Sequence, residues 1–318
     1  MRTVLLFLAV IIAAVFILVA WLFVGCAARV GSRVSLGALS SVPWSSPADS
    51  FLDTSLTSTH VANAPLVVKS PNGMITLRRA GTEVSVKAHI KATTPERAAA
   101  VSINAVRDGN TNSLTIDSTW PGGKPLSNEG VDFVVTLPDA SNITLDSGNG
   151  MIAATGFDCP LTADTGNGRV EIVDHAGGLV VRSGNGKVVL SNIQGACEAS
   201  SGNGDVEAQA LHGSLKAASG NGHLDIALAD DAAGPVNLAT GNGRVELMVG
   251  KAFAGTLTAS TGSGKIKVDV PGATLATNGG RKVWTMPGAG AGAASKIVTG
   301  NGKITVRVND MTMPAGVR

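Results

Sequence analysis

The sequence predicts an all-β fold: a single-stranded β-solenoid with coils of about 18 residues that later lengthen to about 21 residues, preceded by an N-terminal transmembrane helix. Three observations predict it, namely a repeated Gly-Asn-Gly tripeptide, alternating apolar residues on both sides of each copy, and an apolar N-terminal run. The residue numbers of successive copies differ by 18 four times, then by 21 twice and by 38 once, and repetition at this period indicates stacked coils. The central residues are Asn149, Asn167, Asn185, Asn203, Asn221, Asn242, Ser263 and Asn301.

The N-terminal segment, residues 1–26, is expected to attach the chain to a membrane. The apolar run from Val4 to Val24 is unbroken, and a helix of about 20 apolar residues is long enough to span a bilayer. Cys26 follows Phe23-Val24-Gly25, which resembles the lipobox of bacterial lipoproteins, so lipidation of Cys26 is the alternative to a retained helix. Residues 27–58, rich in Ser and Pro, are expected to form a tether.

Residues 59–140 are expected to form a β region that caps the solenoid. Several stretches alternate polar and apolar residues between turn signals, and Ser70-Pro71-Asn72-Gly73 resembles a degenerate first corner. Thr94 followed by Pro95 predicts the N-terminus of one short helix. A terminal coil must cover an open sheet edge, and this atypical segment is placed to do so.

Residues 141–310 carry the repeats, each of which reads as strand, corner, strand. Around Asn167, for example, Leu161 and Ala163 precede the corner, and Val170 and Ile172 follow it, at positions that are apolar or small in nearly every unit. The residues between them are mostly polar, which is the pattern of a strand with one buried face. A six-residue aliphatic period, as in left-handed solenoids, is absent, so we expect right-handed or irregular winding.

The corner residues are interpreted as structural. Glycine on both sides of the Asn would permit positive φ, and stacked Asn amides can bond along the rod axis as a ladder. A phosphate loop would need a following helix and a lysine at the right offset, and a calcium-binding nonapeptide repeat would need an aspartate two residues after the last Gly. Neither is present. A second polar column, two residues before each Asn, comprises Ser147, Thr165, Ser183, Ser201, Ser219, Thr240, Thr261 and Thr299.

Three further features of the repeats lead to expectations. Pro271 to Ser295 interrupts the array with a Gly/Ala-rich run that predicts a protruding loop. Such loops on solenoids often bind ligands, but a Gly/Ala composition is more typical of a merely flexible loop. Cys159 and Cys197 fall two coils apart, so we expect separate thiols. His175 occupies an apolar column and is expected to be a partly buried structural residue.

Composition argues against an enzyme or a nucleic-acid-binding protein. The chain has 25 Lys and Arg against 23 Asp and Glu, and this balance leaves no basic footprint for nucleic acid. Tyr is absent and the few other aromatic residues are scattered, whereas enzymes acting on polysaccharides usually line their grooves with aromatic platforms. The histidines show no metal-binding spacing and no serine elbow occurs. We therefore expect no catalytic residues, no metal and no cofactor.

The order of motifs resembles a known family. An N-terminal apolar anchor, Pro-Asn-Gly-Met-Ile-Thr-Leu at 71–77, Val-Asp-Phe-Val-Val-Thr-Leu-Pro at 131–138 and serial Ser/Thr-Gly-Asn-Gly units are similar to bacterial candidate adhesins, a β-strand-repeat family with a domain of unknown function. The resemblance covers about residues 59 to 308. It implies a single-stranded β-helix outside the cytoplasm, attached to the envelope, with no catalytic residues to carry over.

These observations together predict a non-enzymatic, membrane-anchored envelope protein that serves as an adhesin-like or structural interaction scaffold. The repeat domain is expected in the periplasm or at the cell surface, with the membrane, and an envelope protein or a glycan, as partners. A membrane-anchored sensor or regulatory partner is the alternative, and a polysaccharide lyase or hydrolase is less favoured.

Overall fold

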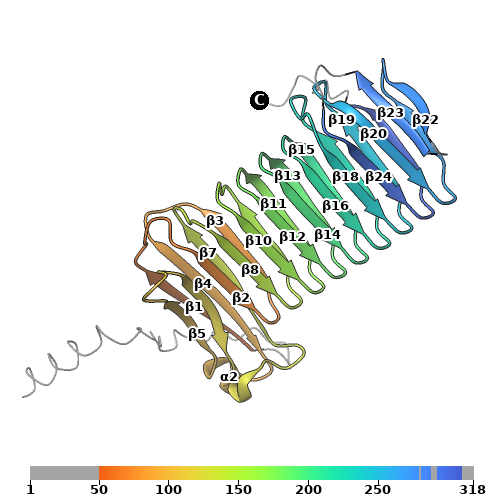
Figure 1. Cartoon of the computed structure of the whole chain (residues 1–318). Coiled ribbons are helices and arrows are strands. Elements are labelled where there is room, and N and C mark those ends of the chain that lie inside the picture. Colours follow the sequence, from red (N-terminus) through yellow and green to blue (C-terminus); the bar gives the residue numbers. More distant parts are fainter. Residues whose placement is uncertain (1–49, 279–280, 288–291, 310–318) are drawn as a thin grey trace, which may run out of the picture.

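The computed structural model describes residues 50–278, 281–287 and 292–309. They form an elongated rod of two long sheets packed face to face, one of 12 strands and one of 13 (Figure 1). Within these ranges no helix is long and apolar enough to cross a membrane. The predicted anchor at residues 1–26, Cys26 and most of the predicted tether lie outside the described residues.

One repeat shows how each coil is built. Strand β10 (Leu161–Thr165) in the 13-stranded sheet leads through the Asn167 corner into β11 (Val170–His175) in the 12-stranded sheet, and the chain then turns back into β12 (Leu179–Ser183). Strands β10 and β12 pair in parallel with Leu161 beside Leu179, one coil apart. The all-β prediction is confirmed, with two long, largely parallel sheets that are consistent with a β-solenoid.

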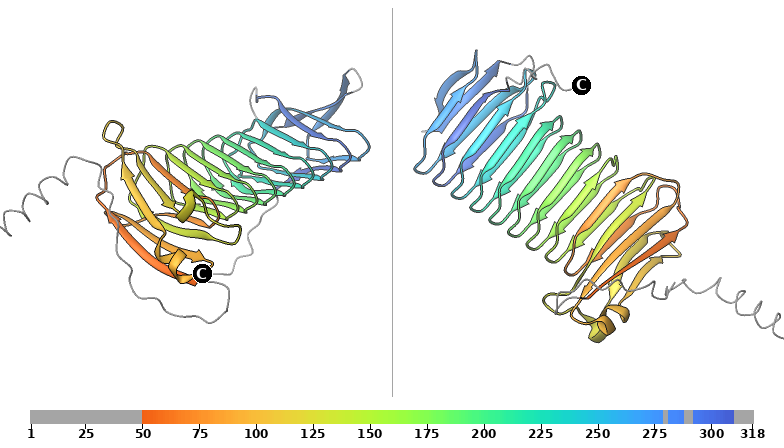
Figure 2. Two further views of the ribbon diagram at one scale, coloured as in Figure 1. Left: turned by 90° about the horizontal axis from the view of Figure 1, so that it is seen from below. Right: turned by 180° about the vertical axis from the view of Figure 1, so that it is seen from behind.

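The other repeat strands follow the same plan in both sheets (Figure 2). In the 12-stranded sheet they are β9 (Ile152–Thr155), β13 (Val188–Ile193), β15 (Val206–Leu211), β17 (Leu224–Leu228), β19 (Val245–Val249), β21 (Ile266–Asp269) and β25 (Ile304–Val308). In the 13-stranded sheet they are β8 (Ile143–Ser147), β14 (Cys197–Ser201), β16 (Leu215–Ser219), β18 (Val236–Thr240), β20 (Ala254–Thr261) and β24 (Ser295–Thr299).

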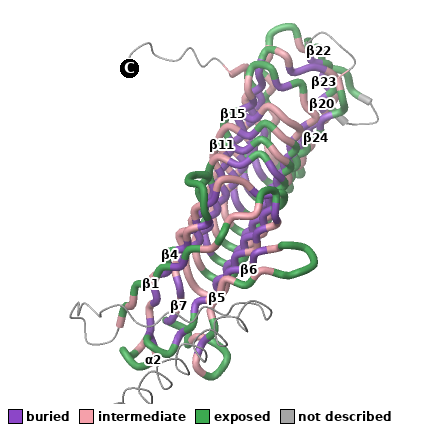
Figure 3. The backbone as a smooth tube through the Cα atoms, turned by 90° about the vertical axis from the view of Figure 1, so that its left-hand side faces the viewer, coloured by how far each residue is buried: buried purple, intermediate pink, exposed green. Residues whose placement is uncertain are grey.

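The core is the narrow layer between the sheets (Figure 3). Alternate residues of each strand point into it, and Leu161, Ala163, Val170 and Ile172 are all buried. Because the strands pair in register, equivalent apolar residues of successive coils lie beside one another and form continuous columns. Burial therefore accumulates coil by coil, and a single repeat could not achieve it alone.

The last coil in the sequence is not the last in space. Strands β24 and β25 lie between the β18–β19 coil and the β20–β21 coil, so the order of coils is reversed at this end. Between them in sequence, β22 (Thr274–Asn278) and β23 (Arg281–Pro287) form an antiparallel pair that extends the 13-stranded sheet beyond β20. The prediction of a protruding loop over Pro271 to Ser295 is therefore wrong for these strands, because Trp284 is buried beside Leu257.

The N-terminal end is closed by antiparallel strands. Strands β2 (Leu66–Ser70) and β3 (Ile75–Arg79) already belong to the stack, followed outward by β6 (Leu114–Thr119) and β7 (Gly130–Leu137). Strands β1 (Ser50–Ser58) and β4 (Val84–Ala92) extend one sheet, and β5 (Ser102–Arg107) extends the other. A 3-10 turn at Pro121–Gly123 follows β6.

Strand β1 corrects the expected extent of the tether, which was placed at residues 27–58. Residues 50–58 pair with β4 along their whole length. Leu56 is buried and Leu52 packs against the core, so the alternation of apolar residues outweighs the polar composition that suggested a tether. The expected short helix is present as α2 (Pro95–Ala99), and the Thr94 side chain accepts a hydrogen bond from the Arg97 amide at its N-terminus.

A second corner, which sequence reasoning missed, returns each coil to the other sheet. Asp174, Asn192 and Ala210 occupy the same position in three successive coils and have φ of 55°, 54° and 52°. This left-handed conformation interrupts the strand alternation, so that the following residue in each coil turns inward. His175 is one of these inward residues and is buried beside Ile193 of the next coil.

Candidate functional site

The predicted ladder residues lie in one row along the rod. The Asn167 side-chain amide donates to Asn149 Oδ1 at 2.6 Å and Asn185 donates to Asn167 Oδ1 at 2.5 Å. The bonds continue through Asn203, Asn221, Asn242 and Asn301 and end with the Ser263 hydroxyl, which donates to Asn301 Oδ1 at 2.8 Å. At the other end Asn149 donates to Asn72 Oδ1 at 2.5 Å, so the degenerate corner also belongs to the ladder.

The serine and threonine column bonds within and between coils. The Ser183 hydroxyl accepts a hydrogen bond from the Gly186 amide of its own corner at 2.8 Å and donates to the Gly168 carbonyl of the previous coil at 2.9 Å. The same pair of bonds recurs at Ser201 and Ser219. Each hydroxyl is therefore a buried link between two successive corners, with its donor and acceptor capacity in use.

The corner glycines are required by space and not by backbone conformation. The expectation of positive φ at these positions is wrong, because neither Gly166 nor Gly168 has a positive φ. A Cβ atom at Gly168 would lie 1.8 Å from the Gly150 carbonyl oxygen, and one at Gly166 would lie 2.4 Å from the Gly148 oxygen. The corners of successive coils are in backbone contact, and only glycine allows so close an approach.

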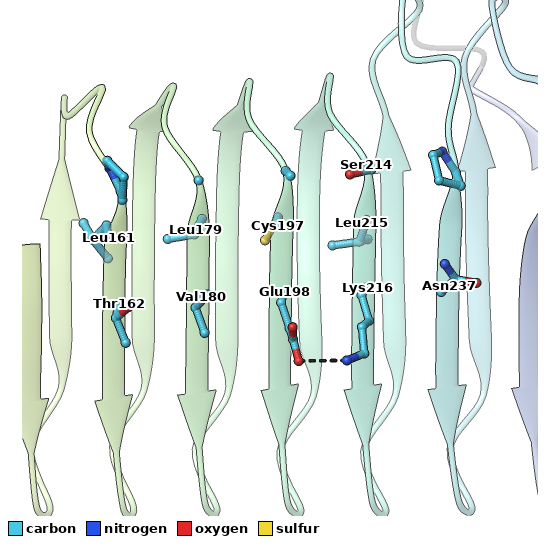
Figure 4. A pocket seen from close by; sticks show the side chains of 14 residues that line it. Leu161, Thr162, Leu179, Val180, Cys197, Glu198, Ser214, Leu215, Lys216 and Asn237 are labelled. Atoms are coloured by element: carbon cyan, nitrogen blue, oxygen red, sulfur yellow. Dashed lines mark hydrogen bonds and ion pairs between the residues drawn. The ribbon is translucent and has the colours of Figure 1, made fainter. Parts of the chain in front are cut away.

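A shallow groove lies on the outer face of the 13-stranded sheet, across β10, β12, β14, β16 and β18 (Figure 4). It has a volume of about 440 Å³ and includes Pro160 at one end and Pro235 at the other. Between the two prolines the corresponding positions hold small residues, Gly178, Ala196 and Ser214. The absence of large side chains at these three positions leaves the sheet surface hollowed along the rod axis.

The polar side of this groove holds one ion pair. Lys216 Nζ on β16 donates to Glu198 Oε1 on β14 at 2.9 Å (Figure 4). The hydrogen bond from Lys216, together with its charge, lowers the pKa of the Glu198 carboxyl. The Lys216 side chain is largely exposed and that of Glu198 is about half exposed, and the carboxylate is ionised at neutral pH. The polar side of the groove therefore presents one positive and one negative charge to solvent.

A second hollow, of about 290 Å³, lies where the ladder begins. It is lined by Asn72, Asn149, Asp132 and the ring pair of Phe51 and His89. The two rings stack with centroids 5.1 Å apart. The His89 imidazole contacts the Asp53 carboxylate at 2.6 Å. Phe51 and Asp53 both come from the strand that was expected to be tether.

Buried reactive side chains are unsuited to chemistry. Cys159 and Cys197 are free thiols, as predicted. Burial raises the pKa of Cys197 to about 12 and also raises the pKa of Cys159, so neither is a nucleophilic thiolate at neutral pH. His175 is buried, and desolvation lowers its pKa although the backbone of Gly178 and Gly177 opposes the shift.

The described residues, 50–278, 281–287 and 292–309, contain no candidate metal site. In these ranges no three His, Cys, Asp or Glu side chains are grouped so that they could hold a metal ion.

Several solved structures match this chain at low sequence identity. Solved structures similar to this chain include a candidate adhesin from Bacteroides fragilis, with 16% identity over 82% of this chain and 98% of that one and a TM-score of 0.46. Another is a candidate lipid-binding protein from Parabacteroides distasonis, at 12% identity over 80% and 96% with a TM-score of 0.44. A third is a candidate cell adhesion protein from Clostridium sporogenes, at 12% over 81% and 99% with a TM-score of 0.24.

The search of curated proteins finds no match. The family model described as Toastrack DUF4097 matches residues 63–307, which include the whole ladder from Asn72 to Asn301. The match extends over the N-terminal strands as well as the repeats, in agreement with their common stack. This chain belongs to the Toastrack DUF4097 family.

Proposed function

We propose that this protein is a membrane-anchored, extracytoplasmic interaction scaffold of adhesin-like type, without catalytic activity. The observation that carries the proposal is that the repeated polar residues hold the coils together. The amides of Asn149 through Asn301 bond to one another, and the serine and threonine hydroxyls bond to the corner backbone. Repeated residues that hold coils together build a rod with long exposed faces, which suits binding over an extended surface.

The position of β1 supports attachment at one end. Strand β1 is the edge strand at one end of the 12-stranded sheet, and β21 is the edge strand at the other. With strands about 4.8 Å apart, these 12 strands extend roughly 50 Å. An anchor in residues 1–26 would hold the rod by its β1 end and present the β21 end at a distance from the bilayer.

The test is localisation of the full chain in its native host. The full chain is compared with a variant lacking residues 1–26 and with Cys26→Ala, by membrane fractionation and by protease treatment of intact cells and of spheroplasts. We expect the full chain in the membrane fraction and its rod cleaved without lysis. The truncated variant should lose membrane association. Loss of a fatty-acid label in Cys26→Ala would identify lipidation, whereas unchanged membrane association would identify the retained helix.

Two outcomes would contradict the proposal. Cleavage of the rod only after rupture of the inner membrane would place it in the cytoplasm. Recovery of a single stoichiometric protein partner from solubilised membranes, with loss of a signalling response on deletion, would instead identify a sensor.

A further inference from the structure

Charge is unevenly distributed along the rod. Residues 251–309 contain eight Lys and Arg against one acidic residue, Asp269, a difference of +7. Residues 141–240 contain four Lys and Arg against eleven Asp and Glu, a difference of −7. The net charge of the whole chain, +2, conceals both regions. The basic residues of 251–309 are Lys251, Lys265, Lys267, Arg281, Lys282, Lys296, Lys303 and Arg307.

The inverted order of the last coils brings three of these lysines together. Strands β25 and β21 pair in parallel with Ile304 beside Ile266 and Thr305 beside Lys267. The preceding residues, Lys303 and Lys265, are therefore neighbours, on the same face of the sheet as Thr305 and Lys267. All three lysines are exposed. We call Lys265, Lys267, Lys303 and Thr305 the tip patch.

On the neighbouring repeat strands of this face, the cations are compensated by acidic side chains. Arg169 pairs with Glu171 at 3.0 Å and Lys187 with Glu207 at 2.5 Å. Both of these acidic residues stand four positions after a corner Asn. Closer to the tip, residues at the same position pair with arginines, Arg244 with Asp225 at 3.1 Å and Arg307 with Glu246 at 2.6 Å.

The acidic row ends before the tip patch. Thr305 and Lys267 occupy the position that carries Glu246 in the adjacent coil. In the described part of the chain no ion pair involves Lys265 or Lys303, and Lys267 contacts Asp269 at 3.2 Å with both side chains mostly exposed. An exposed ion pair of this kind contributes little to stability. The patch thus keeps three closely spaced ammonium groups whose mutual repulsion an anionic ligand would relieve.

We propose that the tip patch binds an acidic polysaccharide through its repeated carboxylate groups. The inference rests on the proposed scaffold function and names its ligand class. Neighbouring strands place the lysine backbones about 5 Å apart, and positions two apart on a strand place them about 7 Å apart, so one polymer can contact several ammonium groups at once. Thr305 adds a hydroxyl that can donate to a carboxylate or bond to a sugar hydroxyl.

The location of the patch favours a polysaccharide over the membrane that holds the anchor. Strand β21 is at the opposite end of its sheet from β1, where the N-terminal segment enters the rod. An anchored rod would hold the patch roughly 50 Å from that end, beyond the reach of a Debye length of about 8 Å from the lipid surface.

The experiment measures binding of the detergent-solubilised full chain to immobilised polygalacturonate, with neutral dextran as the reference, at low and high ionic strength. Lys265→Gln/Lys267→Gln/Lys303→Gln is compared with Lys69→Gln/Lys87→Gln/Lys124→Gln, which removes the same charge from exposed lysines near the β1 end. We expect binding to polygalacturonate alone, weakened by salt. The tip triple should bind at least about tenfold more weakly, and the control triple should change affinity less than about twofold.

Equal losses of affinity in the two triple variants would show that the tip patch is not the binding site. The scaffold function would stand, because the wild-type chain would still bind the glycan. Absence of binding to polygalacturonate would overturn the ligand class, whether or not phosphatidylglycerol vesicles bind. Thermal unfolding of both triples checks the fold, and three exposed substitutions should leave it unchanged.

Discussion

The side-chain amide of Asn301 donates to Asn242 Oδ1 at 2.8 Å across 59 residues of sequence. The intervening Ser263 lies on the far side of Asn301, where its hydroxyl donates to Asn301 Oδ1 at 2.8 Å. The β24–β25 coil is thus held between two coils that precede it in the chain. Strands β18 and β19 can pair with β24 and β25 only after residues 250–294 have been synthesised. This order raises the sequence separation of native contacts and should slow folding.

The ladder should contribute measurably to stability. Asn185→Ala removes a donor to Asn167 and an acceptor for Asn203, and we expect the free energy of unfolding to fall by about 1–2 kcal/mol. Asn110→Ala, in an exposed loop, is the control and should have little effect. Urea denaturation measures both, and equal changes in the two variants would show that the ladder is not stabilising.

The second corner offers adjacent glycines with opposite expectations. A Cβ atom at Gly177 would lie 2.2 Å from the Cys159 carbonyl oxygen, whereas one at Gly178 would meet nothing within 4 Å. Gly177→Ala should therefore lower the free energy of unfolding by about 3 kcal/mol or more. Gly178→Ala should be tolerated. Similar midpoints of thermal unfolding for the two variants would contradict the backbone contact between coils.

His175 should make stability depend on pH. Burial lowers its pKa from the ordinary value of 6.5, so the folded state favours the neutral imidazole. Its contribution is fully present above pH 6.5 and decreases as the pH falls, because the unfolded chain then binds the additional proton. His175→Ile, which copies Ile193 of the next coil, should flatten the stability curve between neutral pH and pH 5. Urea denaturation at each pH measures the free energy of unfolding. If its dependence on pH is the same in His175→Ile as in the wild type, this assignment is contradicted.

The N-terminal closure depends on a buried carboxylate. Glu129 is buried and receives two hydrogen bonds from Arg97 on α2, each at 2.6 Å. The bonds from Arg97 hold the pKa of Glu129 far below its usual range. Stability from this pair is present above the ordinary pKa and is lost as the pH falls through the folded value.

Glu129→Gln should therefore lower the free energy of unfolding by about 2 kcal/mol at neutral pH, since it leaves the Arg97 charge uncompensated. Glu83→Gln is a surface control. Hydrogen exchange of β1 and α2 should increase only in Glu129→Gln, and equal protection in both variants would show that the pair does not hold the closure.

The coils were predictable because each position of a repeat has one environment. Leu161, Val170 and Asn167 recur in columns, and the period alone shows that they stack. The second corner was missed because its left-handed residues, Asp174, Asn192 and Ala210, share no side chain. Their common property is a backbone angle, for which the sequence offered no consistent residue type.

The order of coils could not be read from the sequence. Strands β19, β21 and β25 have the same alternation, so Ile304 fits beside Val245 as well as Ile266 would. The tip patch is a consequence of this hidden order, since Lys265 and Lys303 are far apart in the chain and become neighbours only through the insertion of β25. The groove at Gly178 and Ala196 was also missed, because small outward residues resemble ordinary surface positions.

Closure of both ends by dedicated strands makes the middle of the rod adjustable. Coils such as β10–β11 and β12–β13 pair in parallel with an equivalent coil on either side. Duplication or excision of one such coil would therefore leave β1, β4 and β5 at one end and β20 to β25 at the other unaltered. Each added or removed unit changes the span by about 4.8 Å. Gene duplication could therefore change the length of the rod without redesigning its terminal faces.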